Sequence, residues 1–319
     1  MKRLLIVLGL LFLPPLVFRG EYAYFLSIMT IGSIYAIVAM SLNLLLGYTG
    51  QISLCHAAFF GVGAYGAAMG TAVYSMAPWI GLVLAMVFPG IIALAIGLPT
   101  VRLREHYLAM ATLGIGIIVY AVLRANPCGA TGGPGGIFGI PSLSILGYSI
   151  ASDTSHHLLV AVMVLIIFLL SETLISSRFG TAMQAIHGSP TAALSLGIDV
   201  NRVKLKVFIL SASMAGLAGG LYAFCSPLSY VNPDEVASVM LSVKFIVMVV
   251  IGGSSSLLGG ILGAFLITWL PEFLRTVLHS IPFISPTDLE AIIYGVVLIV
   301  ILIYAPQGLI SWRERRADG

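Results

Sequence analysis

The chain has 319 residues, of which 59% are hydrophobic and only 8% are charged. Soluble domains are about one quarter charged, so this composition excludes an ordinary soluble fold. The formal net charge of +3 comes from 15 Lys and Arg scattered between apolar stretches, which argues against a nucleic-acid surface. Together with a mean hydropathy of +1.08, recurring apolar runs predict an all-α, polytopic transmembrane helical bundle, with residues 1–319 as a single domain.

The apolar stretches predict about ten spans, with eight as the lower bound. The first stretch, Met1 to Phe18, starts with basic residues as a signal peptide does, but it lacks a small-residue cleavage site, so we expect a retained helix. The stretch 239–251 reaches only about 20 Å of a hydrocarbon core of about 30 Å, which leaves a re-entrant element as the alternative. The remaining spans are predicted at 22–46, 57–76, 79–98, 107–123, 157–176, 207–225, 257–274 and 289–305.

The basic residues give the expected orientation, because Lys and Arg concentrate in cytoplasmic loops. With both termini in the cytoplasm, the basic residues of the N-terminus, of 102–104, of 178–206 and of 313–316 all fall inside. We therefore expect a cytoplasmic loop at 177–206 and a periplasmic Gly-rich loop at 125–155.

Three GxxxG pairs are expected to let neighbouring spans approach closely, since glycine has no side chain to separate two helix backbones. They are Gly66 with Gly70, Gly216 with Gly220, and Gly259 with Gly263.

A polar, Gly-rich interruption at 41–61 stands within apolar surroundings. Its polar side chains would be costly against lipid, and a broken helix is tolerated at membrane depth only inside protein or along a cavity. We therefore predict that this interruption and the glycines of 131–136 line a translocation path; the alternative is a turn at the head groups. The predicted path residues are Asn43, Gln51, Ser53, His56, Phe59, Thr131, Gly132 and Gly133.

The predicted cytoplasmic loop is too polar to span and is compatible with helix on both sides of Gly188-Ser189-Pro190. Ser189 is suited to the N-cap of a short helix and Pro190 to its first turn, where the missing N–H costs nothing. Ala192, Ala193 and Leu196 are then expected on one face, at a spacing that could fill a groove on a partner.

Catalytic signatures are missing from the sequence: it contains no GxSxG, HExxH or CxxC pattern, and its three cysteines are too few for a framework. We expect no enzyme activity and no metal site. A GxxxxGK[ST] phosphate loop is also missing, so any ATP that drives this protein would be bound by another chain.

Five blocks of the sequence carry a resemblance to known proteins. The first is SLNLLLGYTGQISLCHAAFFGVGAY at 41–65, and the last, APQGLI, lies near the C-terminus. Between them lie NPCGATGGPGGIFGIP at 126–141, GSPTAALSLGIDVNRVKLKVFILSASMAGLAGGLYA at 188–223 and MVVIGGSSSLLGGILGAFL at 248–266. These blocks resemble the permease subunits of branched-chain amino acid ABC importers, and the TGGPGG block is similar to that of the LivM-type member of the permease pair.

This resemblance implies a permease subunit that pairs with a second, LivH-type permease in a bacterial inner membrane. Two ATP-binding subunits and a periplasmic substrate-binding protein would complete the importer, and this chain would bind no cofactor itself. The resemblance also implies that 185–198 contacts the ATPase. The implied coupling residues are His187, Gly188, Ser189, Pro190, Ala192, Ala193, Leu196 and Gly197.

Lys244 departs from the apolar or acidic residue that the resemblance leads us to expect, so the substrate could be a branched-chain amino acid or a related small amide or carboxylate. Two other functions are considered. A self-sufficient secondary transporter or channel would need intramembrane acidic or Arg residues for ion coupling, and a membrane enzyme would need converging catalytic groups. The spans offer almost none of either beyond Lys244.

Overall fold

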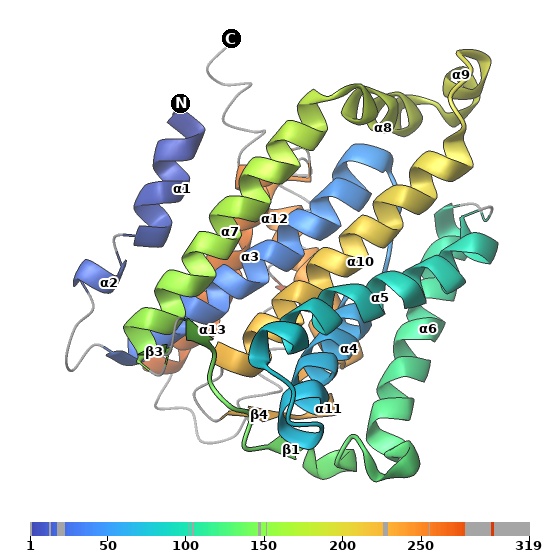
Figure 1. Ribbon diagram of the computed structural model, residues 1–319. Coiled ribbons are helices and arrows are strands. Elements are labelled where there is room, and N and C mark those ends of the chain that lie inside the picture. The colour runs from blue at the N-terminus through green and yellow to red at the C-terminus, as the bar shows by residue number, and fades with distance from the viewer. Residues whose placement is uncertain are drawn as a thin grey trace.

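The computed structural model is almost entirely helical (Figure 1). It describes residues 2–12, 14–17, 23–101, 103, 105–145, 148–150, 152–225, 229–254, 256–277 and 295–296. The predicted span at 289–305, the APQGLI block and the C-terminal basic residues lie outside this part or almost entirely outside it.

The long helices are α3 (Ala23–Thr49), α5 (Pro78–Thr100), α6 (Glu105–Ala125), α7 (Asp153–Ser176), α10 (Val200–Cys225) and α13 (Leu257–Val277). Shorter helices are α1 (Lys2–Phe12), α2 (Pro14–Val17), α4 (His56–Ala68), α8 (Arg178–Gly188), α9 (Pro190–Ser195), α11 (Pro233–Val236) and α12 (Val239–Gly252). A π-helical turn, η2 (Met69–Val73), continues α4, and two 3-10 turns occupy Pro127–Gly129 (η3) and Gly133–Gly135 (η4).

Six segments of the described chain are long and apolar enough to cross a membrane. They confirm the predicted spans that correspond to α3, α5, α6, α7, α10 and the pair α11–α12. The predicted span 57–76 is instead the 13-residue α4 followed by η2, and α13 contributes a shorter apolar helix at Leu257–Glu272. The predicted first span is divided into α1, about 16 Å long at 1.5 Å per residue, and the four-residue α2.

The centre of the bundle is formed by α3, α4 and α10. The most apolar window of α3 is 78% buried and that of α10 is 72% buried, whereas that of α6 is only 22% buried. Both α4 and α5 pack along α10, α13 packs against α3 and α12, and α7 covers another side of α3. The helix α6 therefore lies at the edge, in contact with α4.

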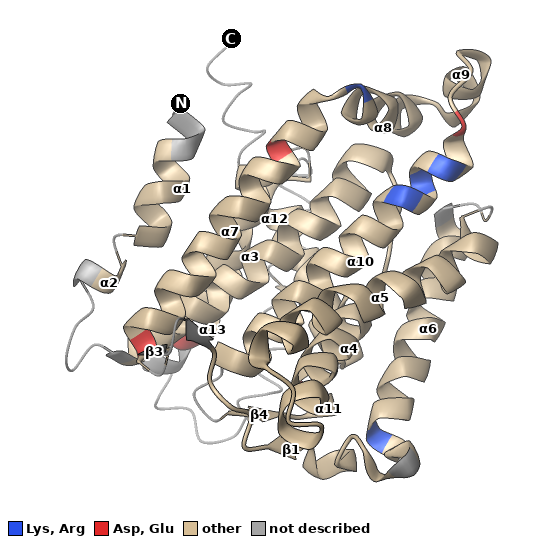
Figure 2. Cartoon of the chain, viewed as in Figure 1, with Lys and Arg blue, Asp and Glu red and all other residues tan. Residues whose placement is uncertain are grey.

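The two ends of the bundle differ (Figure 1). One end carries the antiparallel pair β1 (Ile137–Phe138) and β4 (Tyr230–Val231), in which Phe138 stacks on Tyr230 with ring centroids 4.2 Å apart. A second hairpin pairs β2 (Ser144–Ile145) with β3 (Tyr148–Ser149). The other end carries α8, α9 and the start of α10, where most of the coloured basic residues gather (Figure 2). The predicted loop 177–206 is thus largely helical, because it contains α8, α9 and the start of α10.

Two of the three GxxxG pairs sit where helix backbones approach closely. A Cβ at Gly216 would lie 2.3 Å from the Ala85 carbonyl oxygen of α5, and one at Gly263 would lie 1.9 Å from the Met248 carbonyl oxygen of α12. The pair Gly66 and Gly70 differs: added Cβ atoms there would come no closer than 3.5 and 3.3 Å to any side chain. This third pair also faces α5, at 3.7 Å from the backbone of Ala85 and of Gly81, but without the steric clash that a Cβ would meet at the other two pairs.

Candidate functional site

Residues 50–55 form a non-helical segment between α3 and α4 that enters the bundle from the α8 end. Gly50, with φ of +70°, begins the segment, and a Cβ there would lie 3.4 Å from Nδ1 of His187 in α8. His56 ends it and contacts Ser211, which stands 11 residues, or about 17 Å, into α10. The segment therefore reaches about half the depth of the bundle, and it is much shorter than the predicted interruption at 41–61, because α3 stays helical to Thr49.

The polar side chains of this region lie inside the protein. Asn43 is 0% exposed, Gln51 is 1%, Ser53 is 2% and His56 is 1%. A turn in the hydrated head-group region would leave such side chains accessible, so the burial favours the interior location over that alternative.

His56 joins three helices through hydrogen bonds. Its Nε2 lies 2.7 Å from the Ser211 hydroxyl, which donates to the Ser41 carbonyl at 2.8 Å. Because the Ser211 proton is used for Ser41, Nε2 must carry the imidazole proton and donate to Ser211. The Nδ1 atom is then an unprotonated acceptor, and it has no hydrogen-bond partner among the described residues.

Polar groups of the segment and its flanks form hydrogen bonds with the surrounding helices. The Gln51 amide donates to the Thr49 hydroxyl at 2.9 Å and to the Lys204 carbonyl at 3.4 Å. The backbone N–H of Leu54 donates to Thr112 of α6 at 3.0 Å, and that of Ala57 donates to Ser242 of α12 at 3.2 Å. Side chains thus satisfy backbone donors that a broken helix leaves open.

A second interruption, at 253–256 between α12 and α13, meets α3. The Asn43 amide donates to the Ser256 carbonyl at 2.6 Å and to the Gly253 carbonyl at 3.4 Å. A Cβ at Gly47 would lie 1.5 Å from the Ser254 carbonyl oxygen, so only glycine permits this approach. Asn43 therefore belongs to this second interruption and lies within a helix, not within the first interruption.

Phe59 packs beside the first interruption, whereas the Gly-rich loop does not. The Phe59 ring lies edge-on to His56 and to Phe208, with centroids 6.0 and 5.6 Å away. Thr131 instead donates to the Leu123 carbonyl at 2.8 Å, about 16 Å along α6 from Thr112. Gly132 and Gly133 have φ of +70° and +62° and begin η4 beside it. The predicted path residues therefore fall into separate groups.

Lys244 lies on α12 with intermediate burial, and its Nζ sits 5.3 Å from the centroid of the Tyr35 ring. Such a cation–π contact stabilises an ammonium away from water.

The α8–α9 segment presents a small capped helix. The Ser189 hydroxyl accepts from the Ala192 N–H at 3.3 Å, and Pro190 occupies the first turn, so the predicted cap is confirmed. The predicted common face is not found, since Ala193 is buried against Ile186 and Val200 while Leu196 is 78% exposed. Gly188 lies in open space, and Gly197, with φ of +82°, ends the turn.

Sequence reasoning placed a break between the predicted spans 239–251 and 257–274 but missed its contact with α3, and it missed the hydroxyls that hold the first interruption. The run Gly252 to Ser256 has the same small, polar composition as the first interruption and could have indicated a similar role. Thr112, Ser211 and Ser242 are single polar residues within apolar helices, and nothing in their local sequence distinguishes them. Cys55 and Cys225 are both buried and free.

Comparison with known proteins gives consistent matches. The high-affinity branched-chain amino acid transport system permease proteins LivM of Salmonella typhimurium and of Escherichia coli are each 29% identical, over 93% of this chain and 71% of theirs. The corresponding permease protein LivH of Escherichia coli is 27% identical, over 92% of this chain and 98% of its own length. No solved structure matches the chain significantly.

The family model described as branched-chain amino acid transport system, permease component, matches residues 24–302. This range includes α3 to α13 and both helix interruptions. The matched proteins are transport permeases, which does not favour a secondary transporter or a membrane enzyme. The chain is a multi-pass, all-α membrane protein that belongs to the family of branched-chain amino acid transport permease components.

Proposed function

We propose that this chain is the transmembrane permease subunit of an ATP-driven importer that carries branched-chain amino acids, or a related small amide or carboxylate, across a bacterial inner membrane. The family match over residues 24–302 is the observation that carries this proposal. The substrate class follows from the transport function of the relatives, which are branched-chain amino acid permeases.

The first interruption supports a role in gating the path. Residues 50–55 reach from the α8 end into the middle of the bundle, and α6, α10 and α12 all hold the segment or its flanks by hydrogen bonds. A movement of these helices would move the segment. Gln51, Ser53, His56 and Phe59 would then border the path, with Asn43 fixing the second interruption beside them.

The assembly in this proposal contains a second, LivH-type permease, two ATP-binding subunits and a periplasmic substrate-binding protein. Relatives of both the LivM and LivH types support the permease pair. The absence of a GxxxxGK[ST] sequence supports ATP binding by other chains, with no cofactor on this one. In this arrangement both termini and 177–206 are cytoplasmic, and 125–155 faces the periplasm, where Thr131, Gly132 and Gly133 would lie at the mouth of the path.

The exposed tip of α9 is the proposed contact with the ATPase. Leu194 is 58% exposed and Leu196 is 78% exposed, and an exposed apolar pair at the end of a polar loop suits a groove on a partner. His187, next to Gly50, would transmit a displacement of α8 to the first interruption.

Reconstitution tests the function. Proteoliposomes that hold both permeases, both ATPases, external binding protein and internal ATP should accumulate radiolabelled leucine. This chain alone should show neither uptake nor ATP hydrolysis. Leucine uptake driven by an ion gradient in liposomes that hold only this chain would overturn the proposal in favour of a secondary transporter.

A further inference from the structure

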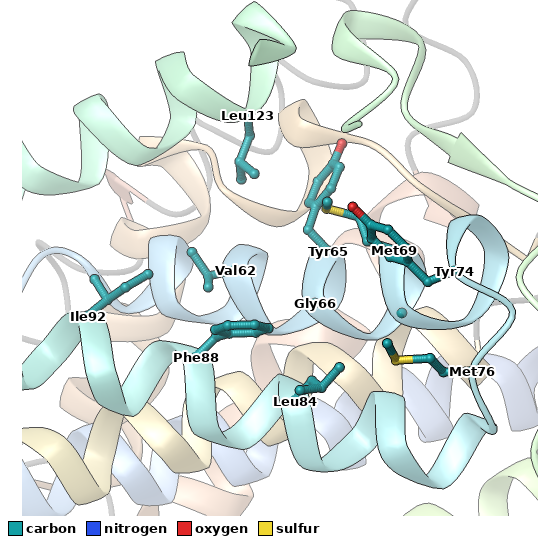
Figure 3. Close-up of a pocket in the computed structure, with 11 residues that line it drawn as sticks. Val62, Tyr65, Gly66, Met69, Tyr74, Met76, Leu84, Phe88, Ile92 and Leu123 are labelled. Carbon is teal, nitrogen blue, oxygen red and sulfur yellow. The ribbon is translucent and has the colours of Figure 1, made fainter. Parts of the chain in front are cut away.

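An apolar groove of about 480 Å³ lies where α4 and η2 form a floor between α5 and α6 (Figure 3). The floor is a stripe along α4 at helical spacing, made by Val62, Gly66, Met69 and Gly70. Leu84, Phe88 and Ile92 of α5 form one wall, at four-residue intervals. Figure 3 shows Leu123 of α6 pointing into the space from the opposite side.

We propose that this groove binds one acyl chain of a membrane phospholipid, a site that goes beyond the transport function proposed above. The lining residues of α4 and η2 run from Val62 to Gly70, or about 12 Å, and Tyr74 and Met76 extend the groove beyond them, toward the roughly 15 Å that one leaflet contributes to the hydrocarbon core. A volume of about 480 Å³ can hold one extended acyl chain of this length, whereas a helix about 10 Å across and about 15 Å long would need roughly 1,200 Å³. One chain therefore fits inside the groove, and a partner helix does not.

The groove is continuous with the surface that faces hydrocarbon. Exposed apolar side chains cover the outer side of α5, such as Val83 at 55% and Ile91 at 56%, and of α6, such as Ile118 at 62%. At the η2 end, Tyr74 and Trp79 are 62% and 37% exposed, as is typical of aromatic residues at the head-group level. A lipid at this surface could place a chain in the groove and its head group beside these rings.

The chemistry of the walls excludes the transported zwitterion as the occupant. Only two side-chain polar groups line the groove, the hydroxyls of Tyr65 and Tyr74. An ammonium and a carboxylate enclosed here would lack charged partners, which is strongly unfavourable. The Tyr65 hydroxyl is itself buried within the protein, so it offers no partner to a charged ligand in the groove either.

The glycines of the floor make the groove and allow it to be filled selectively. An added Cβ at Gly66 would come no closer than 3.5 Å, to Phe88, an ordinary contact. The substitution Gly66→Leu therefore places its side chain in the groove without displacing the backbone. Gly114 of α6 has nothing within 4 Å and does not line the groove, so Gly114→Leu is a matched control.

The test uses the assembled importer in nanodiscs that contain phosphatidylethanolamine with a diazirine at mid-chain, followed by photolysis and peptide mass spectrometry. The wild type and Gly114→Leu should carry label on Met69, inside the groove, and on Ile91, which faces bulk lipid. Gly66→Leu should lose at least nine tenths of the Met69 label and keep that on Ile91. No label on Met69 in the wild type, or unchanged Met69 labelling in Gly66→Leu, would overturn the proposal.

Stability provides a second measurement that does not depend on the photoprobe. Adding phosphatidylethanolamine to the delipidated complex should raise the thermal midpoint of the wild type and of Gly114→Leu by several degrees more than that of Gly66→Leu. If Gly66→Leu does not assemble, Gly66→Ala, whose methyl group is in ordinary contact, should show an intermediate loss of label and of the lipid-dependent shift. An equal shift in all variants would contradict the site, whatever the outcome of the uptake assay.

Discussion

His56 is the residue at which α3, α4 and α10 meet, and its two ring nitrogens have different roles. Nε2 holds Ser211, while Nδ1 is a buried acceptor without a partner among the described residues. An unsatisfied buried acceptor costs about 1–3 kcal/mol. In a transport protein such a group is suited to accept a hydrogen bond from water or substrate when the interior opens.

The substitution His56→Leu should therefore reduce uptake by at least tenfold, equivalent to about 1.4 kcal/mol, while the complex still assembles. Ser211→Ala removes the same hydrogen bond from the other side but retains Nδ1, so it should reduce uptake less. Proteoliposome uptake, with subunit stoichiometry as the assembly control, makes the measurement. Normal uptake in His56→Leu would contradict a role in the path.

Gly63 should tolerate no side chain at all, since a Cβ there would lie 2.1 Å from the Gly216 carbonyl oxygen of α10. Overpacking of this kind costs about 1–3 kcal/mol, so Gly63→Ala should lower the thermal midpoint of the complex. Gly114→Ala, in open space, should leave it unchanged or raise it, because alanine favours a helix by up to about 1 kcal/mol. Equal midpoints would mean that α4 and α10 can separate at no cost.

At this scale the sequence predicts burial better than contacts. Placing polar side chains in hydrocarbon has a high free-energy cost, and this cost correctly indicated that Asn43, Gln51 and His56 lie in the protein interior. Spacing could not tell that a Cβ at Gly66 would make only an ordinary contact of 3.5 Å whereas one at Gly216 would clash, because a GxxxG pair defines a helix face but not how closely the opposite helix approaches.

At the scale of elements, α9 presents two faces with different expected effects. Leu196→Glu places a charge on an exposed side chain and should uncouple ATP hydrolysis from uptake, with the permease still folded. Ala193→Glu buries an unpaired carboxylate beside Ile186 and Val200 and should destabilise the α8–α9 segment by several kcal/mol.

Limited proteolysis and substrate-stimulated ATPase activity distinguish these two variants. Ala193→Glu should be cleaved faster than wild type within 177–206, and Leu196→Glu should not. Wild-type coupling in Leu196→Glu would remove α9 from the ATPase contact.

The boundaries of elements were predicted less well than their existence. The expected interruption at 41–61 is too long, because the Asn43 amide NH₂ donates to carbonyl groups more than 200 residues away and so need not break α3. Such tertiary partners leave no local signal. The capped start of α9 was predictable, since Ser189 and Pro190 act within one turn.

For the whole molecule, the orientation in the membrane is the property most open to test. With its native cysteines replaced, a chain carrying Gly135→Cys should react with an impermeant maleimide in intact cells, since Gly135 has open space around it. Pro190→Cys should react only after permeabilisation. Strong labelling of position 190 from outside would invert the proposed topology. The predicted count of about ten spans stays a prediction, as the six candidate segments do not include the predicted spans at 1–18, 57–76, 257–274 and 289–305.

The hydrogen bonds around residues 50–55 also determine how easily the chain can change its conformation. Thr112, Ser211 and Ser242 each contribute one hydrogen bond to this segment or its flanks, from three different helices. At about 1 kcal/mol each, their loss amounts to about 3 kcal/mol, which makes an open form roughly a hundredfold rarer than the closed one. A partner that binds the open form a few hundred times more tightly would then make it the major population, because differential affinity alone sets such a balance. If residues 50–55 gate the path as proposed, the closed form would then be stable enough to limit leakage and close enough in free energy to be reversed by a partner.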